Sequence, residues 1–138
     1  DEKILIPDSV IVSESSDSKG RIVSPDAISD NEAIFDISSN FLNSVSSFIE
    51  GAGTILWNGP MGFFEKENFN QGTMQIADMI VSSKGFSVAG GGDTIAAAEK
   101  AGVLNKINYV STAGGAFLEF MEGRDLPAIV ALIQNNRN

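Results

Sequence analysis

The sequence predicts an α/β fold with three αβα layers, in which a mostly parallel sheet is covered by helices on both faces. Two observations support this prediction. From about residue 40 onward, short apolar runs typical of buried strands alternate with longer segments of helical periodicity. Three predicted strands are followed by the glycine-rich segments WNGPMG, AGGGDT and STAGGA. In an α/β sheet such loops lie at the carboxyl edge, where ligands bind.

The composition limits the class of protein and its partners. The chain has 138 residues, of which 43% are hydrophobic, so it can bury one core. It has no apolar run long enough to span a membrane and no secretory signal pattern, so we expect a soluble, cytosolic protein. Because it has neither cysteine nor histidine, a bound metal would be a hard ion with oxygen ligands, such as Mg²⁺. The net charge of −9 opposes binding to nucleic acid or anionic lipid.

The N-terminal segment predicts peripheral strands. The run KILIP (residues 3–7) predicts a strand that begins almost at once, without an initiator methionine, so we expect a fragment of a longer protein. Two short β-branched runs, DSVIVS (8–13) and RIVS (21–24), flank the polar stretch SESSDS. They predict a small hairpin or two edge strands.

Residues 40–57 predict a helix followed by a buried strand. The helix carries one apolar stripe, formed by Phe41, Val45, Phe48 and Ile49. Gly51 is placed to end it, and TILW (54–57) then reads as a parallel strand.

The same alternation continues to residue 123. Residues 73–84 predict a second helix, with Thr73 as its cap and Gly85 as its stop. The remaining predicted elements are strands at FSVAG (86–90) and INYVST (107–112) and helices at TIAAAEKAG (94–102) and AFLEFMEG (116–123).

Two of the glycine-rich loops open directly onto predicted helices. Free N–H groups and the positive end of the helix dipole form an anion site at such a junction, so the pair predicts a polyphosphate ligand. The chain contains no Gly-Lys-Ser/Thr sequence, and the dinucleotide fingerprint fails at Ile95. Neither common nucleotide-binding loop is therefore present.

Asp93 places a carboxylate where a phosphate is expected, and two interpretations stay open. At roughly 4 Å and an effective dielectric of about 20, a carboxylate and a phosphate repel each other by ~4 kcal/mol. A magnesium ion between them reverses the sign, because both anions then face a divalent cation. Alternatively, Asp93 or Thr94 caps the helix. The substitution Asp93→Ala separates the two, since loss of a cap leaves metal dependence intact.

The segment NGPMGFFE offers nucleotide contacts, each with a structural alternative. Asn58 can orient a phosphate or close an Asx turn. Pro60 and Phe63 can form an apolar wall for a base or ribose, or pack on the sheet. Glu65 can accept hydrogen bonds from ribose hydroxyls, or be solvated. Phosphoryl transfer needs cationic groups, but Lys66 is the one basic residue at these loops, so we expect nucleotide binding without catalysis by this chain alone.

Three motifs in order, TILWNGPMGFFE, GGGDT and YVSTAGGAFLEFMEG, resemble the C-terminal part of the phosphoglycerate kinase family, and the similarity extends from ILIPDSVIV to EGRDLPAI. The resemblance implies reversible phosphoryl transfer between 1,3-bisphosphoglycerate and Mg-ADP, which gives 3-phosphoglycerate and ATP. It implies that residues 1–138 form the C-terminal part of a Rossmann-like nucleotide-binding domain. The parent would be a monomeric, two-domain cytoplasmic kinase whose N-terminal domain carries the arginine-rich phosphoglycerate site.

The resemblance also implies a role for each motif residue. Asp93 would approach the magnesium ion and Asn58 would lie near the phosphates. Glu65 would hold the ribose, while Pro60 and Phe63 would line the nucleoside pocket. The phosphate contacts would come from Gly90, Gly91, Gly92 and Thr94. The glycines that face the transferring phosphate, and so belong to the catalytic site, would be Gly114 and Gly115.

Two positions depart from the family pattern. Ala113 stands in STAGGA where the family usually has glycine, which adds a methyl group to a loop that approaches its ligand closely. DISSN (36–40) stands where the family usually reads close to DIGP, which bears on Phe35 as an adenine contact. The alternative to a kinase is a noncatalytic nucleotide- or phosphate-binding α/β module.

Overall fold

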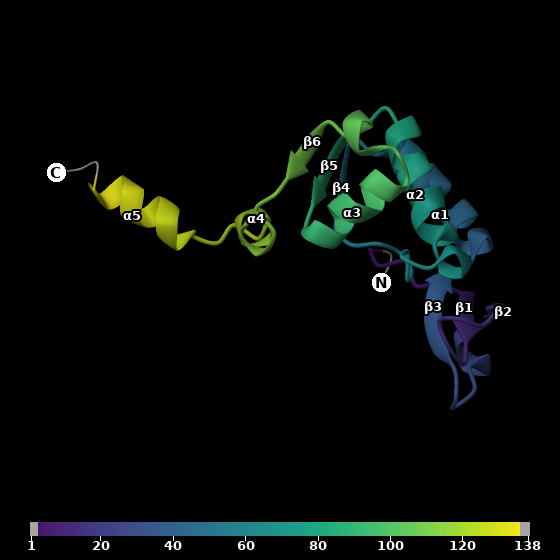
Figure 1. Ribbon diagram of the computed structural model, residues 1–138. Coiled ribbons are helices and arrows are strands. Elements are labelled where there is room, and N and C mark those ends of the chain that lie inside the picture. Colours follow the sequence, from purple (N-terminus) through teal and green to yellow (C-terminus); the bar gives the residue numbers. More distant parts are fainter. Residues whose placement is uncertain (1–2, 136–138) are drawn as a thin grey trace.

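The computed structural model describes residues 3–135 and contains two three-stranded sheets connected by helices (Figure 1). The N-terminal sheet is antiparallel and has the order β2-β1-β3. Its strands are β1 (Val10–Ser13), β2 (Arg21–Val23) and β3 (Ala33–Ile37). The second sheet is parallel and has the order β4-β5-β6. Its strands are β4 (Thr54–Trp57), β5 (Phe86–Gly90) and β6 (Tyr109–Ser111).

The antiparallel sheet confirms the predicted hairpin and corrects the prediction for residues 3–7. β1 and β2 pair around the polar loop. Residues 4–7 form no strand, and Ile4 and Ile6 are 70% and 77% exposed. Within residues 3–135 no strand pairs with this segment, so its backbone groups lack the ladder that would hold it extended. The unpredicted strand β3 pairs with the other side of β1 instead.

The helices that pack on the parallel sheet begin earlier than the sequence predicts. α1 (Ser39–Gly51) follows the buried Ser38, whose hydroxyl accepts a hydrogen bond from the Phe41 N–H. The departure from the family pattern at DISSN therefore supplies a serine cap. α2 (Gln71–Ser82) and α3 (Gly92–Lys100) each begin two residues before their predicted starts. Short 3₁₀ turns lie at Pro25–Ala27, Glu67–Phe69 and Leu104–Lys106.

One face of the parallel sheet is covered by α1, α2 and α3. Successive strands occupy neighbouring positions in one direction, and right-handed crossovers therefore place the connecting helices on the same face. Trp57 and Ala89 point to this face, and together with Leu42, Ile76 and Ala97 they belong to a continuous buried core. The α/β class and the parallel sheet are confirmed.

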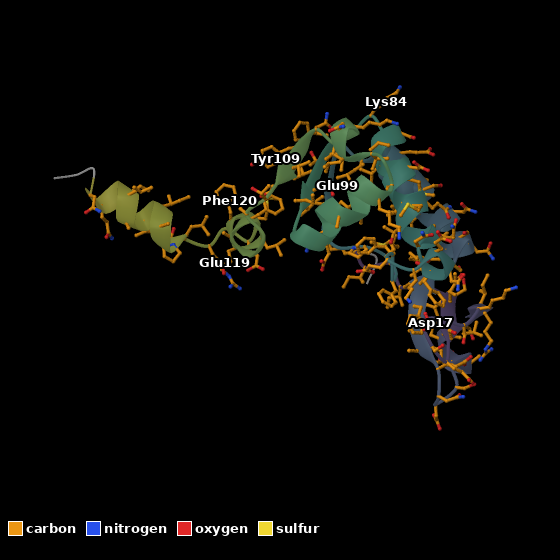
Figure 2. The ribbon with its side chains drawn as sticks, viewed as in Figure 1. Asp17, Lys84, Glu99, Tyr109, Glu119 and Phe120 are labelled. Atoms are coloured by element: carbon orange, nitrogen blue, oxygen red, sulfur yellow. The ribbon has the colours of Figure 1, made fainter. Side chains whose placement is uncertain are left out.

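The opposite face of the sheet is only partly covered. The seven-residue α4 (Gly115–Met121) places Phe117 against Gly90 at the end of β5. Tyr109, Phe120 and Met121 border an apolar depression of about 310 Å³ on this face; Figure 2 labels the first two. α5 (Pro127–Asn135), which the sequence analysis did not predict, extends away from the rest of the chain and has no buried residue (Figure 1). The third layer of the predicted architecture is thus represented by α4 alone among the described residues.

No helix within residues 3–135 combines the length and apolar character needed to cross a bilayer.

Candidate nucleotide site

The two loops that follow β4 and β5 lie side by side at the carboxyl edge of the sheet. Trp57 at the end of β4 is in register with Ala89 of β5, so Asn58 and Gly91 leave the sheet at nearly the same level. The Gly59 N–H donates to the Thr94 hydroxyl oxygen at 2.7 Å, which joins the loops directly. The sequence analysis placed all three glycine-rich loops at the carboxyl edge, and this contact shows that the first two adjoin each other.

The N-terminus of α3 presents backbone donors to the space beyond the sheet. Gly91 is the N-cap residue with φ +96°, a conformation that favours glycine. The Ile95 N–H donates to the Gly91 carbonyl as the first bond of the helix, so the N–H groups of residues 92–94 have no carbonyl partner within it. A side chain at Gly92 would meet no atom within 4 Å. The helix therefore offers three donors and its positive dipole end on an open side.

Asp93 and Thr94 do not cap this helix. Gly91 occupies the N-cap position, and no side chain makes a capping bond there. Asp93 is exposed in the first turn, whereas Thr94 is buried and donates its hydroxyl hydrogen to the Gly90 carbonyl at 2.8 Å. The capping interpretation is therefore wrong, because the backbone turns into the helix at Gly91, two residues before Asp93, the first side chain that could cap it.

The loop at residues 58–63 is held by hydrogen bonds from several elements. Thr73 is fully buried inside α2 and its hydroxyl accepts from the Met61 N–H at 3.1 Å, so its predicted role as a helix cap is wrong. The Trp57 indole N–H donates to the Gly59 carbonyl at 2.8 Å. The Phe63 N–H donates to the Phe35 carbonyl of β3 at 2.7 Å. The antiparallel sheet thus fixes one end of the loop and α2 fixes its centre.

The aromatic residues of this loop form a stack. Phe63, which is 38% exposed, stacks on Phe35 with ring centroids 6.1 Å apart, and Phe35 stacks on the buried Phe69 at 4.7 Å. Pro60 is half-buried beside them in the chain. The stack gives Phe63 a rigid apolar surface whose outer side faces solvent.

A buried carboxylate that the sequence analysis missed supports the same loop. Asp36 in β3 is 1% exposed, and its oxygens accept from the Gly72 N–H and the Ile37 N–H, both at 2.9 Å. Burial raises the pKa of Asp36, and the two backbone donors oppose that shift. A side chain at Gly62 would come within 2.3 Å of the Asp36 carboxylate. The signal in the sequence was an acidic residue inside the apolar run AIFDI. Its hydrogen-bond partner Gly72 lies 36 residues further along the chain.

The two lysines nearest the loops make structural contacts. Lys66 pairs with Asp17 at 2.7 Å, at the end of the molecule that holds the antiparallel sheet (Figure 2). Lys100 lies at the other end of α3 from Asp93, and its ammonium donates to the carbonyls of Phe64 and Glu65 at 2.7 and 2.9 Å. The Glu65 side chain is exposed. Lys100 therefore fastens the backbone that carries Glu65 to α3.

The third glycine loop stands apart from the other two. Gly114 has φ +50° and begins α4, and a side chain at Gly114 or Gly115 would meet no atom within 4 Å. Ala113 is exposed, so its additional methyl group is accommodated. In the described part of the chain, no hydrogen bond joins this loop to the other two. Phe117 of α4 packs against Gly90 at the end of β5.

The surface depressions do not by themselves locate a ligand. One of about 470 Å³ lies between α1 and α2 and includes none of the glycine loops. A second, about 330 Å³, borders Asn58, Trp57 and Met61 on the side of β4. Among residues 3–135 no three acidic side chains gather as a metal site.

Comparison with known proteins places the chain in a family. The phosphoglycerate kinase family model matches residues 1–124. Phosphoglycerate kinase of Baumannia cicadellinicola subsp. Homalodisca coagulata is 47% identical over 137 residues, which cover 99% of this chain and 35% of the relative. The structure of phosphoglycerate kinase from Coxiella burnetii has a TM-score of 0.84 at 47% identity and covers 91% of this chain and 33% of its own. That from Pyrococcus horikoshii OT3 has a TM-score of 0.77 at 33% identity, with 91% and 31% covered.

The chain thus spans about a third of the length of the relatives it matches. The identity, the family match and the fold agree over nearly all of its residues, and the chain belongs to the phosphoglycerate kinase family.

Proposed function

We propose that this chain provides nucleotide and magnesium contacts for a phosphoglycerate kinase, which transfers a phosphoryl group reversibly between 1,3-bisphosphoglycerate and Mg-ADP to give 3-phosphoglycerate and ATP. The observation that carries the proposal is the open N-terminus of α3, where three backbone N–H groups adjoin the exposed Asp93 carboxylate. Transfer to a carboxyl acceptor, cytoplasmic location and a monomeric parent enzyme are parts of the same proposal.

The phosphates of ADP would bind at the β5–α3 loop. Gly90 ends the strand directly below it, Gly91 makes the turn, and the free N–H groups of residues 92–94 would donate to phosphate oxygens. Asp93 would hold Mg²⁺, which supplies positive charge to the phosphate oxygens when it is bound. Asn58 lies beside this turn, because its side-chain oxygen is 3.4 Å from the place where a side chain on Gly91 would begin.

The nucleoside would lie along the neighbouring loop. Phe63 and Pro60 would form its apolar wall, and Glu65 would accept hydrogen bonds from the ribose hydroxyls. Support comes from the exposed outer side of the Phe63 ring and from the bonds of Lys100 that fix the backbone of Glu65. Gly114 and Gly115 would face the transferring phosphate from the third loop, where open space surrounds both.

The acceptor substrate would be bound mainly by a part of the enzyme outside these residues. Phosphoryl transfer needs cations at the moving group, and Lys66 and Lys100 both make structural bonds. We therefore propose that this chain alone binds nucleotide without catalysing the reaction.

Calorimetric titration with ADP, with and without Mg²⁺, tests the proposal. Asp93→Ala should weaken binding at least about tenfold when Mg²⁺ is present, which corresponds to ~1.4 kcal/mol. Without Mg²⁺ the same variant should bind ADP at least as tightly as the original chain, because a repelling carboxylate has been removed.

Glu99→Ala is the matched control, since Glu99 is an exposed acid at the far end of α3 and its removal changes the net charge equally. A folded chain that binds no ADP, or an Asp93→Ala variant that keeps the full effect of Mg²⁺, would contradict the proposal.

A further inference from the structure

The Thr94 hydroxyl is the point at which the two nucleotide loops are joined. Thr94 is 1% exposed, and its hydroxyl lies between the strand end and the neighbouring loop. It donates to the Gly90 carbonyl at 2.8 Å and accepts from the Gly59 N–H at 2.7 Å. The distance from the Gly59 N–H is at the short end of the usual range for its type, and the distance to the Gly90 carbonyl is typical.

This bonding leaves no donor for a phosphate. A threonine hydroxyl has one hydrogen, and here the Gly90 carbonyl takes it. Phosphate oxygens accept hydrogen bonds, so a bond from this hydroxyl to a phosphate would require the bond to Gly90 to break. The backbone N–H of Thr94 remains available in the first turn of α3, as it does for residues 92 and 93.

Both ends of α3 are attached to the loop of residues 59–65, here called the nucleoside loop. Thr94 in the first turn holds Gly59, and Lys100 at the last turn holds the carbonyls of Phe64 and Glu65. The loop from Gly59 to Glu65 therefore has a fixed position relative to the backbone donors of α3. A ligand that touches both parts gains from this arrangement, because neither part has to be ordered when it binds.

We propose that Thr94 is a positioning residue. Its hydroxyl couples the nucleoside loop to the β5–α3 loop, here called the phosphate loop, and does not bind phosphate. The inference rests on the proposed function for the identity of the ligand, but the coupling itself is a property of the loops. A ligand with a base and two phosphates depends on the coupling, whereas a ligand that consists of phosphates alone does not.

The test compares Mg-ADP with Mg-pyrophosphate on the chain and on two variants. Thr94→Val keeps the shape of the side chain and removes the hydroxyl, while Thr94→Ser keeps the hydroxyl. Thr94→Val should weaken Mg-ADP binding about five-fold or more, the factor that corresponds to roughly 1 kcal/mol for a lost hydrogen bond. Its affinity for Mg-pyrophosphate should stay within about two-fold, because the helix still holds the backbone donors. Thr94→Ser should retain most of the affinity for both ligands.

Amide hydrogen exchange provides a readout that needs no ligand. Thr94→Val should raise the exchange rate of Gly59 and leave that of Met61 nearly unchanged, because Met61 donates to Thr73. Thr73→Val should show the reverse pattern. If Gly59 stays protected in Thr94→Val, the proposed coupling is wrong.

The ligand titrations have three outcomes that overturn the proposal. An equal loss for both ligands would make the hydroxyl a phosphate contact, and no loss for either would remove its role. If the original chain binds neither ligand, the proposed function fails for this chain and the nucleotide role of Thr94 fails with it. The exchange of Gly59 still shows in that case whether the hydroxyl holds the loop.

Discussion

Replacement of Gly72 by alanine should destabilise the fold through the buried carboxylate of Asp36. Gly72 is buried in the first turn of α2, and its N–H donates to Asp36 at 2.9 Å. A Cβ atom on Gly72 would lie 2.3 Å from one Asp36 oxygen and 3.0 Å from a side-chain carbon of Ile37. Asp36 is 1% exposed and bonded to two backbone N–H groups, so it has little room to turn away.

The size of the effect follows from three contributions. Forcing an additional carbon into a packed interior costs typically 1–3 kcal/mol, so about 2 kcal/mol is expected here. Displacing the carboxylate weakens a hydrogen bond to a charged group, which is worth ~1.5–3 kcal/mol. The gain from alanine in place of glycine in a helix is about 1 kcal/mol. The net loss of unfolding free energy should be about 2–4 kcal/mol, or a fall in melting temperature of roughly 6–14 °C for a chain of this size.

Gly92→Ala provides the control, and urea or thermal unfolding followed by circular dichroism provides the assay. Gly92 also lies in the first turn of a helix, but its added Cβ would meet nothing within 4 Å. Its stability should stay the same or rise by about 0.4–1 kcal/mol. The reasoning fails if Gly72→Ala is as stable as the Gly92→Ala variant, because the close approach to Asp36 would then have no energetic consequence.

Two other perturbations have expected outcomes. Lys100→Met removes two hydrogen bonds to loop carbonyls and should cost about 1 kcal/mol in urea unfolding, with faster amide exchange confined to residues 63–66; Lys100→Arg should lose less. The guanidinium of Arg21 lowers the pKa of Glu32 to about 2, so the stability that this pair provides is present above the ordinary value of 4.5 and is lost as the pH falls toward 2. Burial raises the pKa of Asp36, so its contribution to stability depends on pH in the opposite direction. That contribution is greatest at low pH and becomes smaller as the pH rises through the pKa of the folded state. The free energy of unfolding, measured between about pH 2 and pH 6, should therefore no longer decline toward acid pH in Glu32→Gln. An unchanged decline would contradict this assignment.

The parallel strands were predictable because their signals are local. TILW and FSVAG are short apolar runs bounded by glycine, and β4 and β5 cover those residues in full. The starts of α2 and α3 were placed two residues late, since Gly72 and Gly92 lie in their first turns and glycine lowers helix propensity. In α2 the cost is offset by the distant carboxylate of Asp36, which no local pattern reveals.

The positions of the site residues were predictable, but the uses of their side chains were not. Spacing after the strands indicates that Asn58 and Gly91 leave the same edge of the sheet, and the register confirms it. Thr73 and Thr94 were both interpreted as helix caps. Their hydroxyls instead accept hydrogen bonds from N–H groups of a loop more than ten residues away. Such bonds depend on the packing of whole elements, so sequence spacing cannot assign them.

The source of positive charge at the site determines how the chain should respond to metal. The net charge is −9, and the lysines nearest the loops, Lys66 and Lys100, bond to Asp17 and to loop carbonyls. Any attraction of these loops for phosphate would come from backbone N–H groups, which together are equivalent to about half an elementary charge. That is too little to offset Asp93 and several phosphate charges at once. A divalent cation bound there would change the balance, because it would offset part of the negative charge of Asp93 and of the phosphates together. Binding of ADP to this chain should therefore depend on Mg²⁺ more steeply than on ionic strength.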